Sequence, residues 1–222
     1  MNYIVRIYGT MLSLQNGMSS EQLFDIMYRG LVWRNADMAP FMKRLKEIAA
    51  GQEIVEFGVS EGQSTFAFLC GKAKSITSYD IRSTRECYNV DAFKYLALKL
   101  GIDFNFIQAD TTRLERIPDC DMLMIDSLHN FSQVVKELKH APSARKLLVL
   151  HDTVGWAESD EGANTPITES DCALYGLPAD DARFKAVGIR PALDLFLDTF
   201  KEKWEIAEHY PEGWGLTVCK RK

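Results

Sequence analysis

The stretch Glu53-Ile-Val-Glu-Phe-Gly-Val-Ser-Glu-Gly-Gln-Ser64 decides the fold. Its apolar start predicts a buried strand, and Gly58 and Gly62 predict a tight turn in which backbone can approach a ligand closely. Ser60 followed by Gln63 is a capping-box pattern, which predicts that a helix begins there. Strand, glycine turn and helix in this order indicate an α/β chain with a helix N-terminus that can receive an anion.

Length and composition predict one soluble domain over residues 1–222. This length is enough for a single α/β domain with a full core. Apolar residues make up 46% of the chain and charged residues 26%, which is typical of globular proteins. The formal net charge of −5 disfavours a nucleic-acid partner, because phosphate binding usually needs a basic surface.

Cysteine spacing and the N-terminus predict a cytoplasmic protein with no membrane partner. The five cysteines form no C-x-x-C pair and no zinc-binding spacing, so we expect reduced thiols. The apolar stretch at the N-terminus is interrupted by Arg6, and it is too short for a signal peptide or a membrane span.

Hydrophobic patterns along the chain predict alternating strands and helices. The expected strands are 53–58, 75–81, 104–110, 121–126 and 146–152, and a hairpin starting near Trp204 closes the chain. Residues 1–50 are expected to form a helical N-terminal extension, with helices over 20–28 and 40–50. Residues 153–186 predict a long loop, interpreted as a substrate lid, with a passive surface loop as the alternative. The predicted fold class is α/β and Rossmann-like: a mostly parallel sheet with a C-terminal antiparallel hairpin and helices on both faces.

Four of the predicted strands have a carboxylate as their last or second-last residue. These residues are Asp80, Asp110, Asp126 and Asp152. A single aspartate after a strand is usually a turn former or helix cap, and Asp110 has that alternative for the segment after it. Ligands of open α/β sheets bind at the carboxyl ends of the strands, so four acids there favour a binding site.

Two common nucleotide fingerprints are absent. Counting from Gly58, the second and third glycine positions of G-x-G-x-x-G are Ser60 and Gln63, which disfavours a dinucleotide cofactor. No G-K-[ST] sequence follows, so a phosphate-binding loop is disfavoured as well. Glu56 adds a negative charge near the turn, which suits a positively charged cofactor.

The pattern Glu56-x-Gly58-x-x-x-Gly62, followed by the strand-end acids, resembles class I S-adenosylmethionine-dependent methyltransferases. The resemblance covers residues 53–222. Three short segments are similar to a small-molecule O-methyltransferase branch that includes sugar and macrolide enzymes: Ile125-Asp-Ser-Leu-His129, Val149-Leu-His-Asp152 and Gly215-Leu-Thr-Val.

This resemblance implies S-adenosylmethionine as the cofactor and a small-molecule hydroxyl as the methyl acceptor. It implies that backbone at Gly58, Ser60 and Gly62 meets the methionine portion, while Gln63 and Ser64 receive its carboxylate. It further implies that Asp80 binds the ribose hydroxyls, Asp110 the adenine amino group, and Asp126 the region of the methionine amino group and sulfonium, with Glu56 as part of the same set.

Two mechanisms remain open from the sequence. In one, Asp126 and Asp152, with His151 as a third ligand, hold Mg²⁺ or another divalent cation that activates the acceptor hydroxyl. In the other, no metal binds, and His129 or His151 is the general base.

The alternative function is a non-catalytic S-adenosylmethionine-binding protein that retains the fold. Helical N-terminal extensions often mediate dimers in the resembled family, so a homodimer is also expected as an option.

Overall fold

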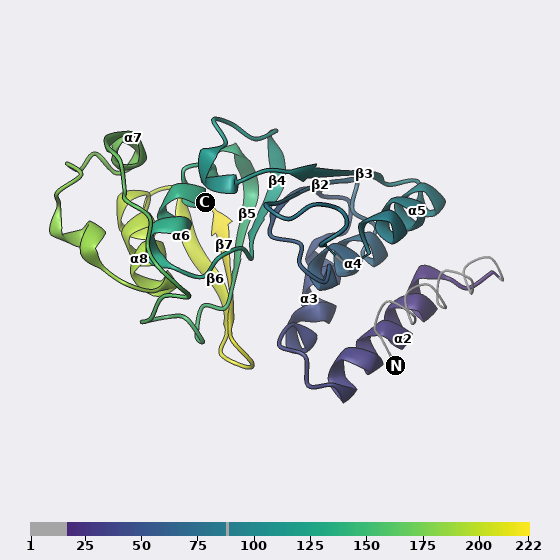
Figure 1. Cartoon of the computed structure of the whole chain (residues 1–222). Helices are drawn as coiled ribbons and strands as arrows, with labels where there is room; N and C mark the ends of the chain where they lie inside the picture. Colours follow the sequence, from purple (N-terminus) through teal and green to yellow (C-terminus); the bar gives the residue numbers. More distant parts are fainter. Residues whose placement is uncertain (1–16, 88) are drawn as a thin grey trace. The chain divides into compact units, whose positions relative to one another are not determined.

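The structure is a computed structural model that describes residues 17–87 and 89–222 (Figure 1). The predictions made for the segment around Arg6 lie outside the described residues. The chain divides into two compact units, residues 1–110 and 111–222, which we describe in turn.

The first unit contains a three-stranded parallel sheet in the order β3-β2-β1. Its strands are β1 (Glu53–Phe57), β2 (Ser75–Asp80) and β3 (Asp103–Gln108). Helix α4 (Gln63–Cys70) connects β1 to β2, and α5 (Val90–Leu100) connects β2 to β3. Figure 1 shows these helices alongside the strands, and α5 contacts β3. The predicted alternation is therefore confirmed here.

From residue 17 on, where the structure describes the chain, three further helices precede β1. They are α2 (Ser20–Trp33), the 3-10 helix η1 (Ala39–Phe41) and α3 (Met42–Ile48). Ser19 and Gln22 form a capping box at the start of α2. The sequence predicted a helix over 20–28, but the helix continues to Trp33, because Gly30 does not adopt the left-handed backbone that would end it. Both α2 and α3 contact α4.

The second unit holds the order β4-β5-β7-β6. Strands β4 (Cys120–Ile125) and β5 (Ala144–His151) are parallel, while β7 (Leu216–Arg221) is antiparallel to both β5 and β6 (Trp204–Tyr210). The predicted fold class, mostly parallel strands with a C-terminal antiparallel hairpin, is confirmed. All six residues of β4 are buried, and all of them except Asp121 are apolar.

Helices α6 (Phe131–Leu138) and α8 (Ile189–Thr199) contact each other in the second unit (Figure 1). Asn130 caps α6, because its side-chain oxygen accepts a hydrogen bond from the Gln133 N–H at 2.9 Å. The segment expected to be a loop contains short helices: α7 (Glu169–Cys172), η4 (Ala173–Tyr175) and η5 (Ala182–Lys185). Two more 3-10 turns, η2 (Thr111–Arg113) and η3 (Ala141–Ser143), flank β4 and α6.

Large aromatic side chains form much of the buried interior of each unit. Phe57, Phe68 and Phe93 are fully buried in the first, and Phe131 and Phe196 in the second. All five cysteines are buried and none is in a disulfide: Cys70, Cys87, Cys120, Cys172 and Cys219. Within the described part of the chain, no helix is both long and apolar enough to cross a membrane.

Candidate functional site

The glycine turn between β1 and α4 depends on residues without side chains. Gly58 and Gly62 both have positive φ, of 86° and 76°. A Cβ at Gly62 would lie 2.1 Å from the ring of Phe93, so no larger residue fits there without movement.

The predicted capping box is wrong. The N-cap of α4 is Gly62, with no side-chain cap, and Ser60 instead adopts a φ of 47°. Its backbone N–H points to the carboxylate of Asp80, at 3.1 Å, rather than into the helix. The first turn of α4 therefore begins with no capping side chain.

Asp80 ends β2 and is only 4% exposed. Its carboxylate accepts hydrogen bonds from the backbone N–H groups of Val59 (2.8 Å) and Ser60 and from the backbone of Arg82 (2.8 Å). The Arg82 guanidinium also donates, with Nε at 3.2 Å. Burial alone raises the pKa of Asp80, but the hydrogen bonds from Val59, Arg82 and Ser60 outweigh it and lower the pKa. Asp80 is therefore an ionised acid held against the glycine turn.

Glu56 lies in the interior of the first unit and is 0% exposed. Its carboxylate accepts hydrogen bonds from the hydroxyls of Ser64, Thr65 and Ser78, each at 2.6 Å. Glu56 thereby connects β1, α4 and β2, and the hydroxyl of the candidate residue Ser64 is directed at it.

Two other candidate residues of the first unit have distinct environments. Gln63 donates its side-chain N–H to Glu61 at 3.3 Å, while its Oε1 is buried and has no hydrogen-bond partner. Asp110 is half-buried and follows the end of β3 by two residues.

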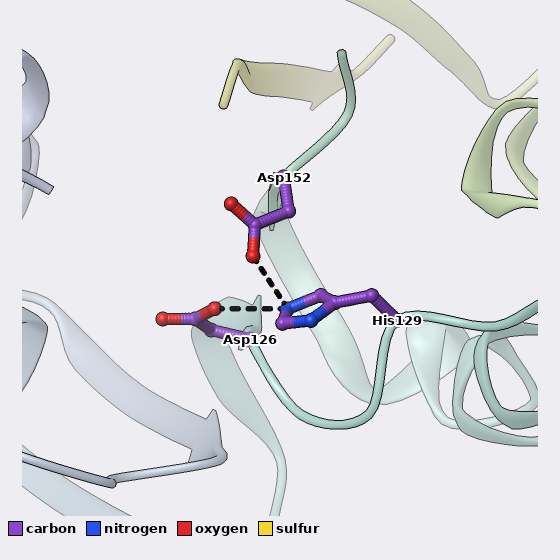
Figure 2. A group of neighbouring side chains, drawn as sticks. All are labelled: Asp126, His129 and Asp152. Carbon is purple, nitrogen blue, oxygen red and sulfur yellow. Dashed lines mark hydrogen bonds and ion pairs between the residues drawn. The ribbon is translucent and has the colours of Figure 1, made fainter. Parts of the chain in front are cut away.

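The second unit brings together an acid–histidine cluster, here defined as Asp126, His129, His151 and Asp152. Asp126 directly follows β4, His151 ends β5, Asp152 follows it, and His129 lies in the turn before α6. Figure 2 shows one nitrogen of the His129 ring directed at two carboxylates. His129 Nε2 lies 2.8 Å from Asp152 Oδ2 and 3.3 Å from Asp126 Oδ1.

His151 faces the same two acids from β5. Its Nδ1 lies 3.0 Å from Asp152 Oδ1 and 3.2 Å from Asp126 Oδ1. Neighbouring residues on a strand normally point to opposite faces, but Asp152 has left the strand and has a φ of 58°. This left-handed backbone, which aspartate tolerates better than most residues, accompanies the placement of both side chains in one cluster.

In the acid–histidine cluster the pKa values of the two histidines are raised and those of the two acids are lowered. Burial lowers the pKa of His129, but hydrogen bonds to Asp126 and Asp152 outweigh it and raise the pKa to about 10. Burial lowers the pKa of His151 as well, but the negative charge of Asp126 is the main opposing cause, and the pKa is raised to about 9. Burial raises the pKa of Asp126 and of Asp152, yet the two imidazoles bring both below the usual range. At neutral pH both acids are ionised and both imidazoles are protonated.

Three members of the cluster have the spacing of metal ligands. One atom each from Asp126, His129 and Asp152 lies within 4.8 Å of the others. The sequence proposed His151 as the nitrogen ligand of a metal or, in the metal-free mechanism, His129 or His151 as the general base. In the structure both histidines contact the two acids, and His129 is the one in this closely spaced group.

Sequence reasoning missed Glu161. Its Oε2 lies 2.8 Å from His129 Nδ1 and accepts the His129 backbone N–H at 3.3 Å. The backbone N–H of Glu161 in turn donates to the His129 carbonyl at 2.8 Å. No motif marks this residue, because it lies in an irregular segment and its partner is 32 residues away.

A second residue that the sequence did not identify is Glu137 on α6. It is 0% exposed and accepts hydrogen bonds from Ser127 (2.7 Å), Gln133 (2.8 Å) and Thr111. Burial raises the pKa of Glu137 to about 7, although these hydrogen bonds lower it. The sequence signal that could have identified Glu137 is its position near Val134 and Leu138, on the apolar side of a helix.

Comparisons with known proteins agree with the architecture. No family model matches the chain, and no curated protein matches its sequence. The structure of 1,6-didemethyltoxoflavin-N1-methyltransferase from Burkholderia thailandensis, with bound 1,6-didemethyltoxoflavin and S-adenosylhomocysteine, is similar at a TM-score of 0.51 and 14% identity. The similarity covers 97% of this chain and 88% of that one. The chain has a Rossmann-like methyltransferase fold.

Two other solved structures are similar at a TM-score of 0.46. One is the O-methyltransferase from Bacillus cereus in complex with SAH, at 12% identity, covering 82% of this chain and 79% of that one. The other is the SAH-bound methyltransferase PaMTH1 of Podospora anserina, at 14% identity, covering 100% of this chain and 88% of that one.

Both groups of candidate residues lie at strand ends of this methyltransferase fold. The glycine turn and Asp80 follow or end β1 and β2, while Asp126 and Asp152 follow β4 and β5. Ligands of open α/β sheets bind outside the carboxyl ends of the strands. These residues are therefore the ones to test for ligand binding.

Proposed function

We propose that this protein is an S-adenosylmethionine-dependent methyltransferase that transfers a methyl group to a hydroxyl of a small molecule. The observation that carries the proposal is the contact of Asp80 with the glycine turn, in a chain with a methyltransferase fold. A strand-end acid whose pKa is lowered stays ionised, as an acceptor of ribose hydroxyls must.

The first unit offers partners for the different parts of S-adenosylmethionine. The first N–H groups of α4 start at Gly62 without a capping side chain, which suits the carboxylate of the methionine portion. The buried Gln63 Oε1 is a free acceptor that suits the amino group. Ribose hydroxyls would replace the contacts that the Arg82 guanidinium makes with Asp80 at 3.2 and 3.4 Å. Asp110 keeps its proposed role with the adenine amino group.

Glu56 is proposed to act indirectly. Its carboxylate is surrounded by three hydroxyls of its own unit, so it positions the glycine turn and α4. This role differs from direct contact with the cofactor, which the resemblance implied.

We further propose that Asp126, His129 and Asp152 hold a divalent cation. Ligands about 2.1 Å from one ion lie roughly 3.0–3.4 Å apart when their angle at the metal is 90–109°. The distances from His129 Nε2, 2.8 and 3.3 Å, are close to that spacing. When bound, the cation would polarise the acceptor hydroxyl and lower its pKa. Two carboxylates with one imidazole suit Mn²⁺, Fe²⁺ or Zn²⁺ better than Mg²⁺.

The charges of the cluster favour the metal over a histidine base. A general base must be unprotonated, yet His129 and His151 both have pKa values raised well above neutral. A bound cation can replace the proton on His129 Nε2, which faces the carboxylates of Asp126 and Asp152. His151 then serves to hold Asp126 and Asp152 in place.

Calorimetric titration tests the cofactor proposal. S-adenosylmethionine and S-adenosylhomocysteine should bind to the wild type, while NAD should not. Asp80→Asn should weaken S-adenosylhomocysteine binding at least 10-fold, because one ribose acceptor is lost. Absence of binding by both sulfur ligands at millimolar concentration would overturn the methyltransferase proposal.

Product analysis tests the acceptor. The protein is incubated with methyl-labelled S-adenosylmethionine and Mn²⁺, or with EDTA, over a panel of sugars and phenols. Label recovered as an ether, and lost with EDTA, is the expected result. Label recovered only on nitrogen acceptors would exclude the hydroxyl assignment.

A further inference from the structure

His129 is held on both of its ring nitrogens. Nε2 faces Asp126 and Asp152, and Nδ1 faces Glu161 at 2.8 Å. A carboxylate only accepts hydrogen bonds, so Nδ1 is the protonated donor toward Glu161. Nε2 likewise carries a proton toward the other two acids, and when a cation takes the place of that proton, the contact with Glu161 keeps the remaining proton on Nδ1.

Glu161 is itself fixed by two backbone contacts to His129. Its N–H donates to the His129 carbonyl at 2.8 Å, and its carboxylate accepts the His129 N–H at 3.3 Å. The side chain of Glu161 is 45% exposed, so a simple ion pair there would contribute little. Its importance lies in orientation, because three contacts join the same two residues.

The neighbours of Glu161 attach its segment to the start of α6. Asp160 Oδ1 accepts the N–H groups of Phe131, at 2.8 Å, and Gly188, at 2.7 Å. Asn164 Oδ1 accepts the Ser132 N–H at 2.8 Å. Phe131 and Ser132 follow His129 by two and three residues, so this segment and the turn that carries His129 are connected at several points.

We infer that Glu161 is a positioning residue for His129, which it holds by Nδ1 so that Nε2 is presented to a metal together with Asp126 and Asp152. The inference rests on the metal role proposed above for this cluster. Histidine ligands commonly donate their second N–H to a carboxylate, which fixes the ring orientation and makes the ligating nitrogen more basic. The segment after β5 thus supplies part of the site.

Metal titration with matched variants tests this role. Mn²⁺ is titrated calorimetrically into the wild type, Glu161→Ala, Glu161→Gln and Glu158→Gln. Glu161→Ala should weaken Mn²⁺ binding 10- to 100-fold, the usual effect of removing such a partner. Glu161→Gln keeps an oxygen acceptor for Nδ1 and should recover most of the affinity. Glu158 is exposed and lies on the same segment, so Glu158→Gln should bind Mn²⁺ as the wild type does.

A spectroscopic readout separates positioning from general structural loss. The chain has four histidines, so ¹⁵N NMR of the rings is simple to assign. In the Zn²⁺-loaded wild type, His129 should be protonated on Nδ1 only. In Glu161→Ala this single form should be lost, while the signals of His140 and His209 stay unchanged.

Several outcomes would overturn the inference. They are a wild type that binds no Mn²⁺, a Glu161→Ala variant that binds it equally well, or an unchanged His129 ring signal in that variant. Titration of S-adenosylhomocysteine into the same samples keeps the two proposals apart. Its binding without metal binding would sustain the methyltransferase assignment and reject the role of Glu161.

Discussion

At the scale of single residues, Asp152 combines a charge with an unusual backbone. Its φ of 58° is unfavourable for most side chains, but aspartate and asparagine tolerate it. Asp152→Asn should therefore keep the fold, with a change in unfolding free energy below about 1 kcal/mol from the backbone. It should still reduce Mn²⁺ affinity at least 10-fold, since a neutral amide replaces an anionic ligand. Calorimetry and thermal unfolding measure the two effects.

Asp152→Ala is the comparison for this prediction. Alanine lacks the ligand and also tolerates a left-handed backbone poorly, which costs about 1–2 kcal/mol. It should lose metal binding and unfold at a lower temperature than Asp152→Asn. Equal Mn²⁺ affinity in Asp152→Asn and the wild type would remove Asp152 from the metal site.

The sequence identified the strand-end residues of the cluster because each follows a recognisable apolar run. Asp126, His151 and Asp152 are all found where strands β4 and β5 end. The sequence did not identify Glu161, because no local pattern distinguishes one acid of an irregular segment from its neighbours. Its role depends on a contact across 32 residues, which only the folded chain creates.

At the scale of elements, Glu56 joins β1 with α4 and β2 through three buried hydroxyls. Glu56→Ala would leave the hydroxyls of Ser64, Thr65 and Ser78 without this acceptor. Each buried polar group that loses its partner costs about 1–3 kcal/mol, so we expect a loss of roughly 3 kcal/mol or more. Urea unfolding measures it, with Ser78→Ala as a control that should cost about 1 kcal/mol. A loss below that of the control would contradict this role.

The parallel strands were predicted to within two residues at every end, because their apolar runs are bounded by turn residues and acids. The cap of α4 was not. Two physical facts outweigh the local Ser60–Gln63 pattern: Gly62 enters the left-handed region, and Asp80 accepts the Ser60 N–H. The short helices after β5 were missed because none of them exceeds four residues.

At the scale of the whole molecule, Glu137 should make stability depend on pH. Its pKa is raised to about 7 in the folded chain, against an ordinary value of 4.5. A raised pKa means that folding favours the protonated acid, so its contribution is full below pH 4.5 and is lost as the pH rises to about 7. The expected loss is about 3 kcal/mol.

Glu137→Gln tests this pH dependence. Unfolding free energies of the wild type and the variant are measured in urea at pH 5 and pH 7.5. Other titrating groups are shared, so the difference between the two proteins isolates Glu137. The variant should gain stability relative to the wild type between the two pH values. A difference that does not change with pH would mean that Glu137 is ionised in the folded chain at both.

The division into residues 1–110 and 111–222 was not evident from the sequence, in which the alternation of strands and helices continues through residue 110. Composition and periodicity report on local structure and burial. They carry no information on how strongly the stability of one part of an α/β chain depends on that of the next part.

The buried cysteines offer a way to measure that dependence. Cys70 and Cys87 belong to the first unit, and Cys120, Cys172 and Cys219 to the second, and burial raises the pKa of Cys70 and of Cys219 to about 12. A thiol reagent can react with them only when the surrounding structure opens. Labelling rates for each cysteine, read by mass spectrometry, give an opening free energy at five internal positions without any mutation. Equal opening free energies at the cysteines of both units would mean that the chain unfolds as one cooperative body. Two distinct groups of values would mean that each unit unfolds by itself.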